Sequence, residues 1–208
     1  DAASEYDLKI FIDKGADIAI YSSHKFLGGP TAGIVAGKSD LIQACYMQNI
    51  GLGRLMKVGK ESVFGAMSVL KAWKERDHEA IRKTETNALN LWQQSAIGFN
   101  GVQANIVGDP TNNPLSRLKI SINKNIFKSS AASVAQALSR CETPIIVRDH
   151  EVELGYFQLD PCNLADGHAE IVASNLHNVL KSASINPLSE VDLDAHRNSS
   201  IQGYLDWK

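Results

Sequence analysis

Four consecutive residues, Ser-Ser-His-Lys at positions 22–25, bring together side chains that can carry out chemistry. They follow the apolar run Ile18–Tyr21 and precede Gly-Gly-Pro at 28–30, which predicts a lysine at the end of a buried strand. A lysine partly withdrawn from water can attack a carbonyl carbon as an amine nucleophile. Nearby hydroxyls and backbone amides can hold a phosphate group. The plain alternative is a solvated surface lysine, because most lysines are exposed.

A second candidate phosphate site, a P-loop over residues 33–39, fails on its spacing. Only three residues separate Gly33 from the Gly-Lys pair at 37–38, and a P-loop needs four so that its amides can wrap a phosphate. The intervening Ile-Val-Ala is typical of a strand rather than of a loop. We therefore expect no nucleotide-binding P-loop here.

The elements that must position residues 22–25 can be predicted from the pattern of apolar residues. Two short strands joined by a glycine-rich loop are expected, with a short helix before them that stops at Gly15. Further helices are expected after them, separated by a basic, glycine-rich loop at 49–60. The predicted ranges are helix 6–14, strands 18–21 and 33–37, helix 39–47, and a long helical region from Val63 to about Gln94.

A change in composition at 98–114, rich in Gly, Asn and Pro, marks a second unit of β-α-β-β-α order. Leu118, Ile120 and Ile122 alternate with polar residues as in a half-buried strand. The other expected elements are a helix capped by Ser129 or Ser130, strands 145–147 and 156–159, and a last helix capped by Asp166. We predict an α/β chain with domains at 1–97 and 98–183 and a tail at 184–208.

Composition narrows the class of protein. The 208 residues include 44% hydrophobic residues, and 21 basic against 23 acidic residues give a net charge of −2, which argues against a nucleic-acid or anionic-membrane surface. No apolar run approaches the ~20 residues of a membrane span. Three cysteines without Cys-x-x-Cys spacing favour neither a disulfide framework nor a metal site, so a reducing, cytoplasmic setting is expected.

The sequence resembles the fold-type I pyridoxal-phosphate enzymes. Asp-Ala-Ala at 1–3, followed by Ser-x-His-Lys at 22–25 and Gly-Pro at 29–30, is similar to the pattern of class V aminotransferases and cysteine desulfurases. The whole string 15–38 is closer still to the selenocysteine-synthase (SelA)-like branch, which includes L-seryl-tRNA selenium transferases and D-glucosaminate-6-phosphate ammonia-lyases. Segments 51–61 and 144–160 resemble the lyase subgroup, and the match extends to about residue 180.

The resemblance implies a role for several residues. Lys25 would form a Schiff base with pyridoxal 5'-phosphate, and Asp1 would pair with the pyridine nitrogen so that the ring accepts electrons. Arg148 would bind a substrate carboxylate through its two-pronged guanidinium. On the same grounds Ala3, Ser22 and His24 would lie around the cofactor, and Arg54, Lys57 and Lys60 would bind a substrate phosphate or complete a partner subunit's site; no metal is implied. Each also has a plain structural alternative as a turn, strand or solvated loop residue.

Some residues depart from the family patterns. Ser4 stands where relatives of the desulfurases carry Gln, and Cys162 stands where related sequences often carry Arg. Cys141 is expected between a helix and a strand rather than on a mobile loop, which disfavours desulfurase chemistry. The resemblance also implies that about half of the large domain would precede Asp1, so that this chain is the C-terminal portion of a longer enzyme.

The expected function is that of a pyridoxal-phosphate-dependent lyase for an amino acid or amino-sugar acid. Proton removal at the α-carbon would be followed by β-elimination and release of ammonia. The first alternative is L-seryl-tRNA selenium transfer, which the net charge does not favour; the second is a non-catalytic α/β binding protein. The full-length enzyme is expected to be a homo-oligomer with shared active sites.

Overall fold

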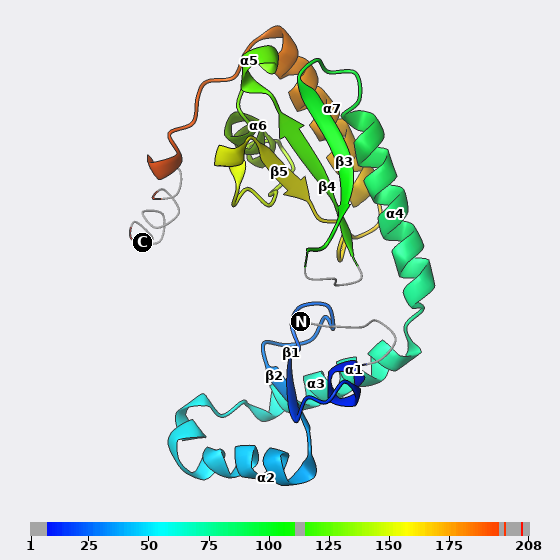
Figure 1. Ribbon diagram of the computed structural model, residues 1–208, viewed down its shortest axis with the longest axis vertical. Helices are drawn as coiled ribbons and strands as arrows, with labels where there is room; N and C mark the ends of the chain where they lie inside the picture. Colours follow the sequence, from blue (N-terminus) through cyan, green and yellow to red (C-terminus); the bar gives the residue numbers. More distant parts are fainter. Residues whose placement is uncertain (1–7, 111–114, 196–197, 199–204, 206–208) are drawn as a thin grey trace. The chain divides into compact units, whose positions relative to one another are not determined.

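The computed structural model describes residues 8–110, 115–195, 198 and 205 (Figure 1). The chain divides into two compact units, which are described separately below. Unit 1 comprises Asp1–Arg82 and Asp109–Leu115, and unit 2 comprises Lys83–Gly108 and Ser116–Lys208. This division falls inside helix α4 (His78–Ser95), whereas the change in composition placed the boundary at 97/98. Among the described residues, no helix is long and apolar enough to cross a membrane.

Unit 1 is built on a two-stranded antiparallel sheet, in which Ile18 pairs with Gly37 and Ser22 with Gly33. One face of β1 is buried through Ala19 and Tyr21, but Ile20 on the other face is 69% exposed. Both strands of this sheet were expected to be buried. Within the described part of unit 1, only one face of β1 is buried. Its elements are α1 (Ile10–Asp13), β1 (Ile18–Ser22), β2 (Gly33–Gly37), α2 (Ser39–Met47), the 3-10 helices η1 (Gln48–Ile50) and η2 (Leu52–Met56), and α3 (Lys60–Glu75).

The long helical region predicted from residue 63 to 94 is interrupted. Helix α3 ends at Glu75, and α4 (His78–Ser95) begins after a break at Arg76 and Asp77. The carboxylate of Asp77 accepts a hydrogen bond of 2.9 Å from the backbone N–H of Ala80, so it caps the first turn of α4. The sequence did not reveal this break, because a run of charged residues is also typical of the exposed face of a continuous helix.

Unit 2 contains a three-stranded antiparallel sheet in the order β3-β4-β5. Helices α4, α6 and α7 supply residues to the same core as β4 and β5, and Figure 1 shows α6 and α7 behind the strands. Alternate residues of β4 (Leu118, Ile120 and Ile122) are buried, as the sequence predicted. The elements are β3 (Val102–Gly108), β4 (Ser116–Ile122), α5 (Lys124–Phe127), α6 (Ala131–Ser139), η3 (Val152–Leu154), β5 (Tyr156–Leu159) and α7 (His168–Ile185).

Three features of unit 2 differ from the sequence prediction or refine it. Strand β3 lies in the segment 98–114, where the sequence analysis saw a change in composition and assigned no strand, because glycines at both ends hid its alternation. Segment 145–147 is not a strand. In place of a regular strand, a single β-bridge joins Arg148 to Gln158 of β5. Ser130 is confirmed as the N-cap of α6, since its side chain accepts a hydrogen bond from the N–H of Ser133.

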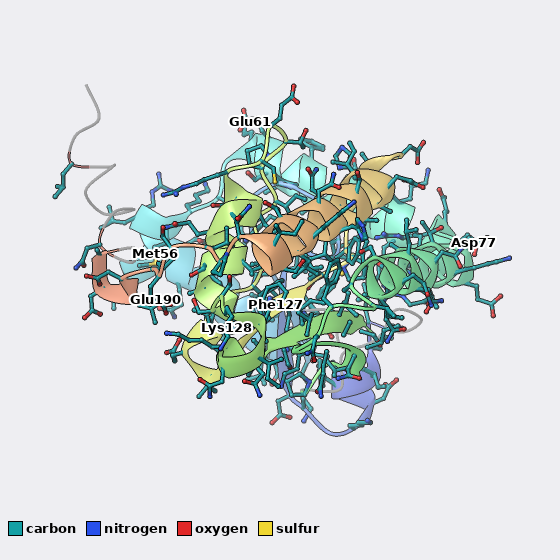
Figure 2. The ribbon with its side chains drawn as sticks, turned by 90° about the horizontal axis from the view of Figure 1, so that it is seen from above. Met56, Glu61, Asp77, Phe127, Lys128 and Glu190 are labelled. Carbon is teal, nitrogen blue, oxygen red and sulfur yellow. The ribbon has the colours of Figure 1, made fainter. Side chains whose placement is uncertain are left out.

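The chain after α7 packs against α6 and α5. The N–H of Leu188 donates to Ser129 Oγ at 3.0 Å, and Ser133 Oγ donates to the carbonyl of Ser189 at 2.8 Å. Glu190, labelled in Figure 2, pairs with Lys124 at 2.9 Å. Leu188 and Leu193 pack against the core. The first part of the predicted tail is therefore part of unit 2.

Candidate active site

Lys25 lies on a loop that the backbone holds closed. Strand β1 ends at Ser22, and the loop returns to β2 at Gly33. The N–H of Ser23 donates to the carbonyl of Ala32 at 2.9 Å, and the N–H of Gly29 donates to the carbonyl of Ser23 at 2.7 Å. Gly28 has φ +73°, a conformation that L side chains rarely adopt. The loop therefore has a defined shape without help from a ligand.

Helix α3 supports this loop from one side. A Cβ atom on Gly29 would come within 2.9 Å of Val69, and one on Gly65 would come within 2.8 Å of Pro30. These close approaches explain why glycine is needed at both positions. Leu27 of the loop and Trp73 of α3 are buried in one apolar cluster. Arg76 Nη1 also donates a hydrogen bond of 3.1 Å to the carbonyl of Phe26. The lysine loop and α3 thus form one packed assembly.

The predicted cofactor residues of this loop are accessible. Lys25 and His24 are exposed, and Ser22 is half-buried at the end of β1. The sequence predicted a lysine withdrawn from water, but the described residues of unit 1 do not withdraw it. Asp1 and Ala3 lie outside the described residues. Ser23, which the sequence analysis did not single out, is fully buried, and its hydroxyl makes no hydrogen bond within the described part of the chain.

The basic loop residues lie among exposed apolar side chains. Arg54 belongs to η2 and Lys57 follows it, and both are exposed. Around them Leu52, Leu55 and Met56 are 94%, 96% and 88% exposed, and Met56 is labelled in Figure 2. Lys60 is the first residue of α3 and is also exposed. Apolar side chains of this size exposed together are typical of an interaction surface.

Arg148 belongs to unit 2. Its N–H donates to the carbonyl of Gln158 at 2.8 Å, and its carbonyl accepts from the N–H of Gln158 at 3.0 Å. It lines a cavity of about 270 Å³ whose walls are mostly apolar, with His168 and Asp160 among the polar residues. The cavity is also lined by Trp92, Ile145, Leu159, Leu164 and Val172. An arginine beside such a cavity can bind the carboxylate of a partly apolar ligand.

A partly buried ion pair fixes the end of β5 near this cavity. Arg117 Nε donates to Asp160 Oδ2 at 2.8 Å, and the N–H of Cys162 donates to Asp160 Oδ1 at 3.0 Å. Burial by itself raises the pKa of Asp160, but the hydrogen bonds from Cys162 and the charge of Arg117 outweigh it, so the pKa lies below its ordinary value. Asp160 is therefore a fixed anion.

Among the described residues, neither the cysteines nor the residue types that bind metals form a competing site. Burial raises the pKa of the Cys141 thiol, which makes it a poorer nucleophile, and its Sγ donates weakly to the carbonyl of Ala137 at 3.6 Å. Cys45 is exposed on α2. Within the described ranges no group of three or more His, Cys, Asp or Glu residues could hold a metal ion.

Comparison with solved structures defines the class of protein. The structure of D-glucosaminate-6-phosphate ammonia-lyase matches with a TM-score of 0.68 and 28% identity, covering 88% of this chain and 48% of that one. That enzyme has the fold-type I architecture of pyridoxal-phosphate enzymes, and this chain has the fold of the part that it covers. The predicted fold class is therefore confirmed.

Sequence comparison then gives the family. The L-seryl-tRNA selenium transferase (SelA) model matches residues 3–147, and the chain belongs to this family. D-glucosaminate-6-phosphate ammonia lyase of Salmonella typhimurium is 29% identical over 88% of this chain and 49% of its own length. A 5'-C-glycyluridine monooxygenase-decarboxylase of a Streptomyces species is 30% identical over 86% of this chain and 45% of its own length. An L-seryl-tRNA(Sec) selenium transferase of Moorella thermoacetica is 28% identical over 83% of this chain and 40% of its own length. The chain spans about half the length of these relatives.

The residues that the structure describes fit a pyridoxal phosphate in part. An exposed primary amine, an imidazole and a hydroxyl lie within four consecutive positions of one closed loop. The amine can bond to an aldehyde, and the hydroxyl can donate to a phosphate oxygen. The acidic partner for a pyridine nitrogen would be Asp1, outside the described residues.

Proposed function

We propose that this chain is part of a cytoplasmic pyridoxal-phosphate-dependent lyase that acts on an amino acid or an amino-sugar acid. The observation that carries the proposal is the structural match to an ammonia-lyase over 88% of the chain, together with Lys25 on a closed loop at the end of β1. The reaction removes the α-proton of the substrate, eliminates a β-substituent and releases ammonia.

Each predicted site residue of this chain would have its own role in this reaction. The cofactor, when bound, supplies an electron sink for the charge left after removal of the α-proton. Lys25 would hold the cofactor until the substrate amine displaces it, and its freed amine would then take the α-proton. Asp1 keeps the pyridine nitrogen protonated, while Ala3, Ser22 and His24 lie around the cofactor and its phosphate. Arg148 orients the substrate through its carboxylate.

Arg54 and Lys57 have a second role in this proposal. They bind a substrate phosphate or complete the site of a partner subunit in a homo-oligomer. The exposure of Leu52, Leu55 and Met56 beside them supports a protein contact at this segment. Replacing Leu55 with Asp should lower the association state measured by sedimentation, whereas Asp replacing Ile97, an exposed residue of unit 2, should leave it unchanged.

L-seryl-tRNA selenium transfer is the alternative within the family. The family model carries that description, but the lyase relatives match over a greater share of this chain. A net charge of −2 does not favour binding of a tRNA. A non-catalytic α/β protein is the alternative outside the family, and it would not develop the yellow absorbance of a lysine-linked cofactor.

Borohydride reduction tests the central assignment. The protein is incubated with pyridoxal 5'-phosphate, reduced, digested and mapped by mass spectrometry. A pyridoxyl group should appear on Lys25 and be lost in Lys25→Ala, while Lys38→Ala, an exposed lysine of the same unit, should label normally. Labelling of Lys38 or Lys57 with Lys25 unmodified would overturn the assignment.

A further inference from the structure

Arg76 reaches the lysine loop from the end of helix α3. Its Nη1 donates a hydrogen bond of 3.1 Å to the carbonyl of Phe26, although the two residues are 50 positions apart in the chain. Phe26 is the residue directly after Lys25. The guanidinium therefore holds the backbone one residue beyond the predicted Schiff-base lysine.

The ring of Trp73 gives this guanidinium a fixed surface. Arg76 Cζ lies 5.1 Å from the ring centroid of Trp73, within the range of a cation–π contact. His78 contacts the same ring edge-on, with 4.7 Å between the two centroids, and its Nε2 lies 3.0 Å from the carbonyl of Trp73. Since Trp73 is only 6% exposed, its ring cannot move away from these contacts without opening the apolar cluster around it.

The break between α3 and α4 sets the backbone of Arg76. Helix α3 ends at Glu75, and Arg76 has an extended conformation with φ −71° and ψ 133°. Asp77, labelled in Figure 2, accepts the hydrogen bond from the N–H of Ala80 that caps α4. The position of Arg76 is thus determined by a helix end on one side and a helix cap on the other.

The hydrogen bond from Arg76 fixes the middle of a tight turn that begins at Lys25. The N–H of Gly28 donates to the carbonyl of Lys25 at 2.9 Å, which closes the turn. The carbonyl of Phe26 belongs to its middle peptide group, the group whose rotation distinguishes type I from type II turns. Leu27 does not have the positive φ that type II requires, and its side chain is buried. The two peptide groups that follow Lys25 are therefore both held, the first by Gly28 and the second by Arg76.

We propose that Arg76 is a positioning residue for Lys25. It holds the middle peptide group of the turn, so that the loop presents the lysine amine to an aldehyde in one orientation. Reaction between two groups is fastest when both are held in the reacting geometry. Arg76 acts through Phe26 and the turn, not through contact with the cofactor. The inference rests on the proposed function, in which Lys25 bonds to pyridoxal phosphate.

Site-resolved labelling tests the effect on the lysine. The 208-residue chain is incubated with increasing concentrations of pyridoxal 5'-phosphate, reduced with borohydride and mapped by mass spectrometry. The label on Lys25 is divided by the label on Lys38, an exposed lysine of the same unit. In Arg76→Met this ratio should fall at least about tenfold, because the turn loses a hydrogen bond from a charged donor. The concentration series separates weaker binding of the aldehyde from slower formation of the bond.

Two further variants separate the position of Lys25 from the charge of the helix end. Arg76→Lys keeps a cation that can donate to the same carbonyl, so its ratio should lie clearly above that of Arg76→Met. Lys74→Met removes an exposed cation from the last turn of α3 and should leave the ratio unchanged. Thermal unfolding followed by circular dichroism is recorded for each variant, because an unfolded chain would label all exposed lysines alike.

Hydrogen exchange measures the turn without any cofactor. In Arg76→Met the N–H of Gly28 should exchange at least about tenfold faster, since the turn that it closes opens more often. The amides paired between β1 and β2 should exchange as in the wild type. A general loss of stability in unit 1 would instead accelerate both sets of amides.

The inference would be overturned if Arg76→Met kept the wild-type labelling ratio, if Lys74→Met lost as much of it, or if the strand amides exchanged faster together with Gly28. The proposed function fails separately. In that case Lys25 of the wild type would carry no pyridoxyl group, while the exchange of Gly28 would still show whether Arg76 holds the turn.

Discussion

The guanidinium of Arg117 and the carboxylate of Asp160 form an ion pair of 2.8 Å across the end of the β4–β5 ladder, with side chains only 11% and 27% exposed. The two residues are 43 positions apart in the chain. This pair fixes the strand end next to the cavity that Arg148 lines.

Replacing Asp160 with Asn should destabilise unit 2 by about 3 kcal/mol, because a largely buried guanidinium loses its anion. The free energy of unfolding from urea titration measures the effect. Glu142→Gln, an exposed carboxylate of the same unit, should change stability by less than about 0.5 kcal/mol. A loss in Asp160→Asn no larger than that of Glu142→Gln would show that the pair does not stabilise the fold.

The same carboxylate predicts a dependence on pH. The pKa of Asp160 is lower in the folded chain than its ordinary value, so its ionisation stabilises the fold above about pH 3.9 and the contribution is lost as the pH falls through the lower, folded-state pKa. The stability difference between the wild type and Asp160→Asn should be constant above about pH 5 and shrink below about pH 4. A difference that stays constant down to the acid transition would contradict this.

Gly29→Ala should distort the lysine loop, since the new Cβ would collide with the hydroxyl of Ser23 and approach Val69 at 2.9 Å. We expect a loss of about 1–3 kcal/mol in the stability of unit 1 and less pyridoxyl label on Lys25. Trp73 fluorescence and mass spectrometry measure the two effects.

Gly33→Ala is the matched control, because no atom lies within 4 Å of its Cβ position. Adding Ser23→Ala to Gly29→Ala should restore part of the stability, since it removes the oxygen that the new methyl meets. If Gly29→Ala and Gly33→Ala lose the same stability and the same pyridoxyl label, the close packing of this loop has no influence on Lys25.

Limited proteolysis should leave a fragment of unit 2. Its core unites residues from α4 through α7, whereas the described core of unit 1 centres on Leu27 and Trp73. Trypsin should cut first at the exposed Arg54 and Lys57, and the resistant fragment should begin near Lys83 and extend past residue 190. Mass spectrometry identifies the ends of the fragment. A resistant fragment within residues 8–82 would contradict the expectation that the core of unit 2 is the more stable of the two.

The sequence predicted local elements better than long-range pairs. The strand before Lys25 and the N-cap at Ser130 could be identified because a few adjacent residues determine them. The pairing of Arg148 with Gln158 depends on β-sheet register, which no local pattern encodes when a single bridge replaces a regular strand. The exposure of Lys25 could not be predicted either, because it depends on which segments cover the loop.

The packing of residues 188–193 over α5 and α6 has a consequence for synthesis. Leu188 and Leu193 complete the core of unit 2, yet they leave the ribosome after every helix and strand that they cover. Until then the part of α6 around Ser133 stays accessible to water and to chaperones. Unit 2 should therefore reach its final packing only after residues 188–193 have left the ribosome, although its strands and helices can form earlier.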